Sequence, residues 1–149
     1  MIHIAKTLWD EASQKTHIEV SFAGGALKDL NRELKLNIDE HEGTTPEEFL
    51  AAGLSSSYTA ALIKELEKKG YRVQQLATEV EVHTNDKREG AIARIDICTE
   101  AMIPGITFAD FLQNAEHALE KCTVTKALEA VEILLHPTLK MGMLSEIMI

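Results

Sequence analysis

The apolar residues of this chain recur with a helix period in some segments and with a strand period in others. The strongest helix signal begins at Thr45, a good N-cap residue that is followed by Pro46 at the first helical position. Glu48 completes a Thr-x-x-Glu capping box. The pattern predicts a helix that runs to about Lys69 and stops at Gly70.

On either side of this helix the pattern changes to that of strands. Before it, Thr16–Phe22 (THIEVSF) and Leu34–Ile38 (LKLNI) are predicted to be short strands. After it, Arg72–Val82 alternates between apolar and polar residues, Thr84–Gly90 (TNDKREG) has the composition of a hairpin turn, and Ala91–Ile103 is a second long strand. A β-hairpin is therefore predicted directly after the helix.

A second helix is predicted after this hairpin. Pro104 and Gly105 break the long strand, and Thr107 together with Asp110 opens a helix that continues to about Lys121.

The end of the chain returns to strand character. A short helical piece is predicted over Thr125–Leu128, and a final strand over Val131–Leu135 that Pro137 closes. No repeat, low-complexity segment or linker interrupts the chain. Residues 1–149 are therefore predicted to form a single α+β domain.

The bulk composition fits this class and excludes several kinds of partner. With 149 residues, 45% of them hydrophobic, such a chain can bury about 70% of its unfolded surface without disulfides. The net charge of -9 argues against nucleic acid and against an anionic membrane as partners. Apolar runs are too short for a membrane span, the first residues do not resemble a secretion signal, and two cysteines fit a reducing compartment. We therefore expect a cytoplasmic protein.

The middle of the first helix, AAGLSSSYTAA, is unusually rich in small residues. Small side chains allow another element to approach the backbone closely, and Gly53 costs helix stability. Leu50, Gly53, Leu54, Ser57 and Ala61 share one face at helical spacing, which predicts that Ser57 is at least partly buried. On spacing alone, a core serine bonded to a carbonyl one turn earlier is favoured over a functional position.

The two cysteines differ in their predicted surroundings. Cys122 ends the apolar stripe of the second helix, where a cysteine is by default a small hydrophobe. Cys98 is predicted to be more exposed, beside carboxylates that raise a thiol pKa. The predicted stripe of the second helix consists of Phe108, Phe111, Leu112, Ala115, Leu119 and Cys122.

Other common catalytic and binding patterns are absent from the sequence. The six histidines show no HxH or HExxH spacing, and no CxxC pair is present, so we predict no metal site. No GxSxG elbow surrounds a serine, and Gly24 with Gly25 is too short a signal for a phosphate loop. We predict no cofactor.

Three motifs resemble one known family, the osmotically inducible and organic-hydroperoxide-resistance (OsmC/Ohr) proteins. Gly43–Gly53 (GTTPEEFLAAG) resembles the family's G-T-N-P-E-E/Q-L-hydrophobic-A-A-A/G run. Ile103–Ile106 (IPGI) resembles its V-P-G-I, and Cys122–Leu128 (CTVTKAL) resembles its C-P-V-S-x-x-L. The motifs keep the family's order and spacing, and the resemblance extends from Gly43 to Leu139.

The resemblance implies both a fold and a chemistry. The implied fold is OsmC-like α+β, with antiparallel sheets and two long helices in an intertwined homodimer whose active site lies between the subunits. The implied chemistry is reduction of organic hydroperoxides by two cysteines. One cysteine, midway along the first helix, attacks the peroxide, and the second closes a disulfide that a small dithiol reduces. An arginine and a glutamate orient the attacking thiol.

Carried onto this chain residue by residue, the resemblance is incomplete. Cys122 matches the resolving cysteine, with Thr123 in place of the usual proline, and Glu47 matches the supporting glutamate. Ser57 occupies the attacking position. Arg32 is the only arginine before the first motif, and its neighbourhood does not match the family pattern.

The serine changes the chemistry that we expect. A thiol can be tuned to a thiolate near neutral pH, whereas a serine hydroxyl is far less acidic and has no oxidisable sulfur. We expect the two-cysteine cycle to be lost or severely impaired, and an inherited apolar pocket at the dimer interface to bind a hydroperoxide or lipid-like ligand. Three alternatives stay open: a one-cysteine peroxidase using Cys122 or Cys98, a hydrolase or transferase with Ser57 as nucleophile, and a structural dimer without a ligand.

Overall fold

The structure is a computed structural model that describes residues 3–8, 17–22, 35–37, 45–85 and 90–140. The chain divides into two compact units, Met1–Phe49 and Leu50–Ile149. Each unit is described by itself, and the single domain expected from the sequence stays a prediction.

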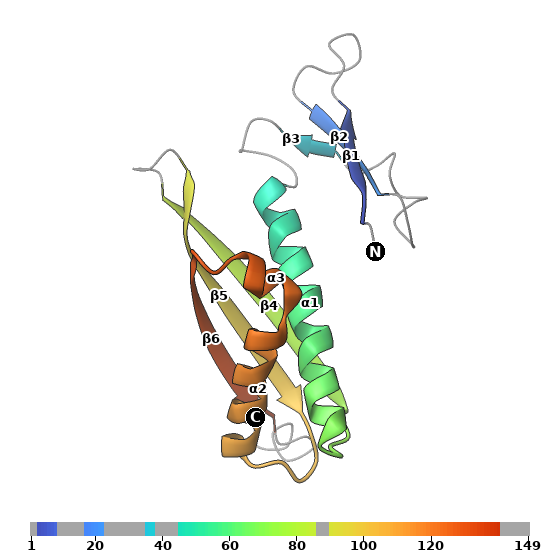
Figure 1. Ribbon diagram of the computed structural model, residues 1–149, viewed down its shortest axis with the longest axis vertical. Coiled ribbons are helices and arrows are strands. Elements are labelled where there is room, and N and C mark those ends of the chain that lie inside the picture. Colours follow the sequence, from blue (N-terminus) through green and yellow to red (C-terminus); the bar gives the residue numbers. More distant parts are fainter. Residues whose placement is uncertain (1–2, 9–16, 23–34, 38–44, 86–89, 141–149) are drawn as a thin grey trace. The chain divides into compact units, whose positions relative to one another are not determined.

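The first unit contains a small antiparallel sheet (Figure 1). Its strands are β1 (Ala5–Leu8), β2 (His17–Phe22) and β3 (Lys35–Asn37), in the order β1-β2-β3. The strands β2 and β3 confirm the two that were predicted here. No strand was predicted at β1, because its four residues, AKTL, are too few to show a period.

Helix α1 (Pro46–Lys68) starts and stops where its capping residues predict. The backbone N–H of Glu48 donates to Thr45 Oγ1 at 3.2 Å, as a capping box requires. At the other end Gly70 has a positive φ of 86°, and the N–H of Tyr71 donates to the Leu66 carbonyl at 3.1 Å. Only glycine adopts this backbone conformation without strain, which explains why the helix ends here.

The second unit contains a three-stranded sheet in the order β4-β5-β6. Strands β4 (Gln75–Asn85) and β5 (Ala91–Met102) pair antiparallel, as the predicted hairpin requires, although β4 begins and ends three residues later than expected. Strand β6 (Glu132–Leu139) pairs parallel with β5, so the expectation of antiparallel sheets is wrong for this pair. The chain must therefore cross over between the two strands. Helices α2 (Phe108–Lys121) and α3 (Thr123–Ala127) make that crossover.

The prediction that Pro137 closes the final strand is wrong. Pro137 lies inside β6, opposite Thr99 of β5, and the strand continues to Leu139. Among the described residues β6 pairs on one side only, with β5. An edge strand tolerates proline because one side of it has no ladder hydrogen bonds to lose.

Helix α2 begins with the predicted cap. The N–H of Asp110 donates to Thr107 Oγ1 at 3.1 Å. The predicted apolar stripe is only partly correct, because Phe108 is 52% exposed whereas Phe111, Ala115 and Cys122 are buried. A residue in the first turn of a helix can project past its packing partner, and its spacing does not reveal this.

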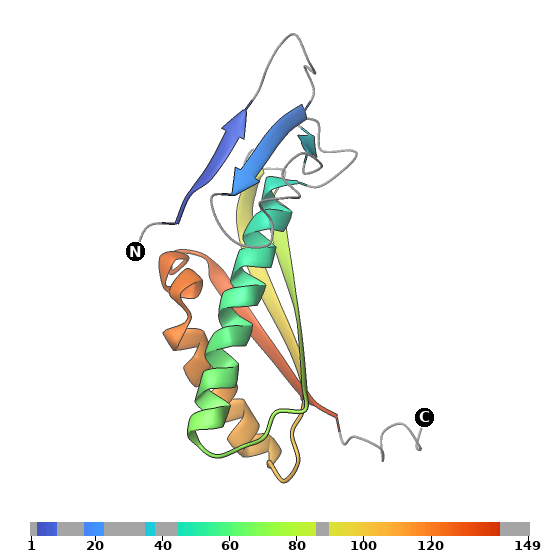
Figure 2. The same ribbon diagram turned by 90° about the vertical axis from the view of Figure 1, so that its right-hand side faces the viewer.

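Both long helices cover the same face of the sheet β4-β5-β6, and the core lies between these two layers (Figure 2). Thr99 of β5 approaches Thr78 of β4 at 3.4 Å, and Thr59 of α1 donates to Thr78 at 2.9 Å. Thr99 therefore faces the helices, and Cys98 faces the other way. No described helix is long and apolar enough to cross a membrane. The buried apolar residues of this core are Leu54, Tyr58, Leu62, Leu66, Ile95, Ile97, Ala101, Ile103, Phe111, Ala115, Ala118 and Cys122.

Candidate active site

The two residues that match the family's cysteine pair lie together in the fold. Ser57 is half-buried in the middle of α1, and Cys122 is buried at the junction of α2 and α3. In its thiol form Cys122 Sγ donates to Ser57 Oγ at 3.2 Å. The sequence prediction that these positions share one site is thus supported by direct contact, and Ser57 is partly buried as expected.

The thiol of Cys122 is easier to ionise than an ordinary thiol. Burial by itself raises its pKa, but hydrogen bonds from Ser57 and from the backbone of Thr125 outweigh burial. The backbone N–H of Val124 contributes in the same direction, and the resulting pKa lies below the usual value. Donors that stabilise a thiolate make it available for reaction at neutral pH. Cys122 lies in the apolar core, as the default prediction has it, but a polar group also contacts its sulfur, so its reactivity stays a prediction.

The serines around Ser57 have different partners. Ser56 Oγ donates to the Ala52 carbonyl one turn earlier at 2.7 Å, which is the bond first considered for Ser57. Ser55 Oγ donates to the Thr78 carbonyl of β4 at 3.2 Å and ties α1 to the sheet. Among the described residues, Ser57 is the only one of the three that contacts a thiol.

Gly53 does not have the packing role that the sequence indicates. It is exposed, and a Cβ added there would meet no atom of the described residues within 4 Å. The face of α1 that packs into the core consists instead of larger residues four apart, Leu54, Tyr58, Leu62 and Leu66. Close approach of another element to Gly53 thus does not occur within the described chain.

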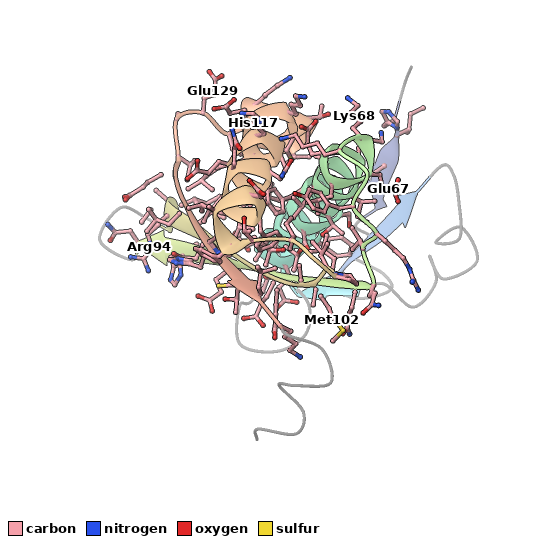
Figure 3. The ribbon with its side chains drawn as sticks, turned by 90° about the horizontal axis from the view of Figure 1, so that it is seen from below. Glu67, Lys68, Arg94, Met102, His117 and Glu129 are labelled. Carbon is pink, nitrogen blue, oxygen red and sulfur yellow. The ribbon has the colours of Figure 1, made fainter. Side chains whose placement is uncertain are left out.

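A cavity of about 240 Å³ opens beside Ser57 and Cys122. One side of it is small and apolar, from Ala60 and Ala61, whereas charged groups surround the rest. Figure 3 shows one of these groups, Lys68, on α1 on the helix side of the sheet. The complete lining is Ser57, Ala60, Ala61, Lys64, Glu65, Lys68, Lys121, Cys122 and Thr123.

The sequence gives no sign that Glu65 belongs to this site. Glu65 is 5% exposed, and Lys121 donates to its Oε1 at 2.7 Å, which joins α1 to the end of α2. That hydrogen bond, with nearby lysines, lowers the pKa of Glu65, so the carboxylate stays charged. Lys121 balances the charge of this carboxylate, so Lys64 and Lys68 give the cavity an excess of positive charge. The chain as a whole has a net charge of -9.

Tyr58 is a buried residue next to Cys122. Its hydroxyl donates to the Ala115 carbonyl of α2 at 3.0 Å and holds the two helices together. Burial, and then the neighbouring Cys122, raise the pKa of Tyr58 well above its usual value. Tyr58 therefore stays neutral and keeps its donor proton. A tyrosine in an apolar stripe is the one sequence signal that could have identified it.

Cys98 is not part of this site. It lies half-buried on the side of β5 that faces away from the helices, opposite Glu79 of β4. Burial raises the pKa of Cys98, and the carboxylates of Glu81, Glu79 and Asp96 raise it further. The predicted contrast with Cys122, more exposure and a raised pKa, is confirmed.

The matched glutamate, Glu47, lies away from Ser57 along α1. Glu47 lies in the first turn of α1, ten residues before Ser57, which is about 15 Å along a helix. No contact between them occurs in the described residues, so the supporting role of Glu47 stays a prediction. Arg32 lies outside the described residues.

Comparison with known proteins gives one consistent result. Residues 39–135 match the family model described as OsmC-like protein. The peroxiredoxin OsmC of Escherichia coli (strain K12) is 27% identical over 133 residues, which cover 89% of this chain and 92% of that protein.

Solved structures agree on the fold. An OsmC-like protein of unknown function from Vibrio cholerae superposes with a TM-score of 0.74 at 17% identity, covering 92% of this chain and 99% of the other. An organic hydroperoxide resistance protein OsmC from Legionella pneumophila superposes with a TM-score of 0.66 at 20% identity, covering 93% and 97%. At such identities the likeness concerns the fold alone, and it confirms the predicted OsmC-like α+β fold.

Proposed function

This chain belongs to the OsmC-like protein family, and we propose that it reduces organic hydroperoxides with Cys122 as its single reactive thiol. In this proposal the two-cysteine cycle is lost, because Ser57 stands where the attacking cysteine is expected. The observation that carries the proposal is the 3.2 Å contact between Cys122 Sγ and Ser57 Oγ, next to an open cavity.

The contact supports a change of roles. A disulfide needs two sulfur atoms about 2.0 Å apart, so Ser57 and Cys122 cannot form one. A hydroxyl at hydrogen-bond distance instead stabilises a thiolate. Ser57 then donates a hydrogen bond that stabilises the Cys122 thiolate. Cys122 attacks the peroxide in place of the cysteine that the family has at position 57.

The reaction can be written with Cys122 alone. Its thiolate attacks the terminal peroxide oxygen, the O–O bond breaks, and the alcohol leaves with a proton, so that a sulfenic acid forms on Cys122. An external thiol then condenses with the sulfenic acid, releasing water and leaving a mixed disulfide, and a second thiol restores Cys122. Cys98 cannot act as the second thiol, because it lies on the opposite side of the sheet.

The cavity supports a substrate with an apolar part. Ala60 and Ala61 provide a small apolar wall, and Lys64 lies beside the opening. We propose that the family's apolar pocket is completed by a second subunit in a homodimer. Glu47 would keep there the supporting role that the resemblance implies, and the protein would work in the cytoplasm.

The test is peroxide consumption by the purified protein, with cumene hydroperoxide as substrate and a dithiol as reductant. We expect slow turnover in the wild type, none in Cys122→Ser, and unchanged turnover in Cys98→Ser, which is the matched control. Ser57→Cys should be faster, because it restores a two-cysteine pair. Turnover that survives Cys122→Ser refutes the proposal. Turnover in Ser57→Cys alone shows that the wild type is a binding scaffold.

Light scattering tests the dimer separately. A mass of two chains is expected. A monomeric mass would remove the second subunit from the site, and with it the role of Glu47.

A hydrolase that uses Ser57 as nucleophile receives no support from the described contacts. The hydroxyl hydrogen-bonds to the Cys122 thiol, and no described histidine or carboxylate reaches it. Labelling of Ser57 by a fluorophosphonate probe would show that Ser57 is nucleophilic, and it would favour the hydrolase over the peroxidase.

A further inference from the structure

A second cluster of reactive groups lies on the face of the sheet β4-β5-β6 that points away from the helices. His83 Nε2 is 2.8 Å from Asp96 Oδ2 and 3.3 Å from Glu81 Oε2. One donor atom from each of these three side chains lies within 4.8 Å of the others. We propose that Glu81, His83 and Asp96 form a binding site for a first-row divalent transition metal, of which Zn²⁺ is the probe.

The spacing of these atoms fits a metal ion between them. A tetrahedral site with metal–ligand bonds of about 2.0–2.1 Å places neighbouring ligand atoms about 3.3 Å apart. The distance from His83 Nε2 to Glu81 Oε2, 3.3 Å, matches this value, the distance to Asp96 Oδ2, 2.8 Å, is shorter, and the remaining pair lies within 4.8 Å. An imidazole with two carboxylates is a ligand set that zinc and its neighbours accept, and it leaves one position open.

A second observation points to a ligand at the same place. The Nε2 atom of His83 is enclosed and lies within ion-pair distance of Asp96 Oδ2 and Glu81 Oε2, but neither contact has the geometry of a hydrogen bond. Enclosed polar atoms nearly always have a hydrogen-bond partner, so this nitrogen needs an explanation. A metal ion between the three side chains would bind the free electron pair of this nitrogen.

The carboxylate at the centre is already held in position. Asp96 is 6% exposed, and its other oxygen, Oδ1, lies 2.9 Å from His136 Nε2 of β6. A partner of this kind orients a ligand and strengthens metal binding. Arg94 acts in the opposite sense, because its Nε donates to Asp96 Oδ2 at 2.9 Å and competes with a metal for that oxygen. Its side chain is 44% exposed, so it can move aside into solvent.

Sheet register explains why the sequence shows no metal pattern here. Glu81 and His83 are two residues apart on β4 and share one face, and Asp96 is the residue opposite Glu81 on β5. The third ligand thus comes from another strand, which no short spacing motif contains.

The experiment uses the full chain, freed of metal with a chelator and titrated with Zn²⁺ against a chromophoric indicator. We expect one bound ion per chain, and at least about tenfold weaker binding in His83→Gln, as losses of metal-site partners typically give. His117→Gln changes a half-buried histidine of α2, on the helix side of the sheet in Figure 3, and is the matched control that should bind like the wild type. Arg94→Gln should bind more tightly, because it removes the competing cation.

Two outcomes overturn the proposal. One is an equal affinity of the wild type and His83→Gln, or no binding by either. The other is a thiolate-to-cobalt absorption band when Co²⁺ replaces Zn²⁺, because that band means that a cysteine holds the metal. The side chain of His83 is 40% exposed, so its replacement should leave the fold intact, and an unchanged circular dichroism spectrum checks this. Neither result depends on whether Cys122 reduces peroxides.

Discussion

The two cysteines of this chain lie on opposite sides of one sheet, and their pKa values are displaced in opposite directions. Cys122 is the more buried of the two, yet its pKa is lowered. Cys98 is the more exposed, yet its pKa is raised. Exposure alone would predict the reverse order, since burial disfavours a charged thiolate.

The difference lies in what surrounds each sulfur. Hydrogen-bond donors from Ser57, Val124 and Thr125 are directed at Cys122. Carboxylates surround Cys98, and each of them repels a second negative charge. Reactivity of a thiol in this fold is therefore set by the polarity of its immediate neighbours more than by its access to water.

The largest expected effect concerns which thiol ionises first. With Cys98→Ser only Cys122 remains, and its thiolate should form below the pH of an ordinary thiol. With Cys122→Ser only Cys98 remains, and its thiolate should form above that pH. At neutral pH we therefore expect a larger thiolate population for Cys122 than for Cys98. Ultraviolet thiolate absorbance against pH measures both, and coincident titration curves would contradict the comparison.

The next effect isolates the hydroxyl that stabilises Cys122. Ser57→Ala removes a hydrogen bond to a charged group, which should lower the Cys122 thiolate population at neutral pH by about tenfold. Ser56→Ala is the matched control, because Ser56 bonds only to the Ala52 carbonyl. Alkylation rates by iodoacetamide, in the Cys98→Ser background, report the change. Equal rates in the two variants would remove Ser57 from the site.

A smaller effect concerns the frame that holds α1 against α2. Tyr58→Phe removes the hydroxyl that donates to the Ala115 carbonyl and should cost about 1 kcal/mol of unfolding free energy. Urea denaturation followed by circular dichroism measures the loss. An unchanged midpoint would mean that this hydrogen bond does not hold the helices together.

The smallest effect is expected on the other face of the sheet. Glu79→Gln removes one carboxylate near Cys98 and should raise its thiolate population less than about threefold, since exposed charges are screened by water and salt. The titration is made in the Cys122→Ser background at low and high salt. An effect that does not shrink with salt would show that charge repulsion is not its cause.

Local sequence signals predicted both long helices. Helix caps act over a few residues, so they can be recognised from the sequence alone. The caps at Thr45 and Thr107 and the stop at Gly70 are examples. The predictions were wrong where contacts with other elements determine the local structure. Pro137 is tolerated because β6 is an edge strand, and Phe108 is exposed because the core ends before it.

The sequence by itself determined most of the elements, the family and the serine at position 57. Each follows from residues close together in the chain or from a motif that can be compared directly. Only the tertiary structure decided that Cys122 meets Ser57, 65 residues away, with lysines around their cavity. Packing of α1 on α2 also decided the burial of Glu65, and strand register brought Asp96 to His83. Distances between remote side chains depend on how whole elements pack, and no local rule contains that information.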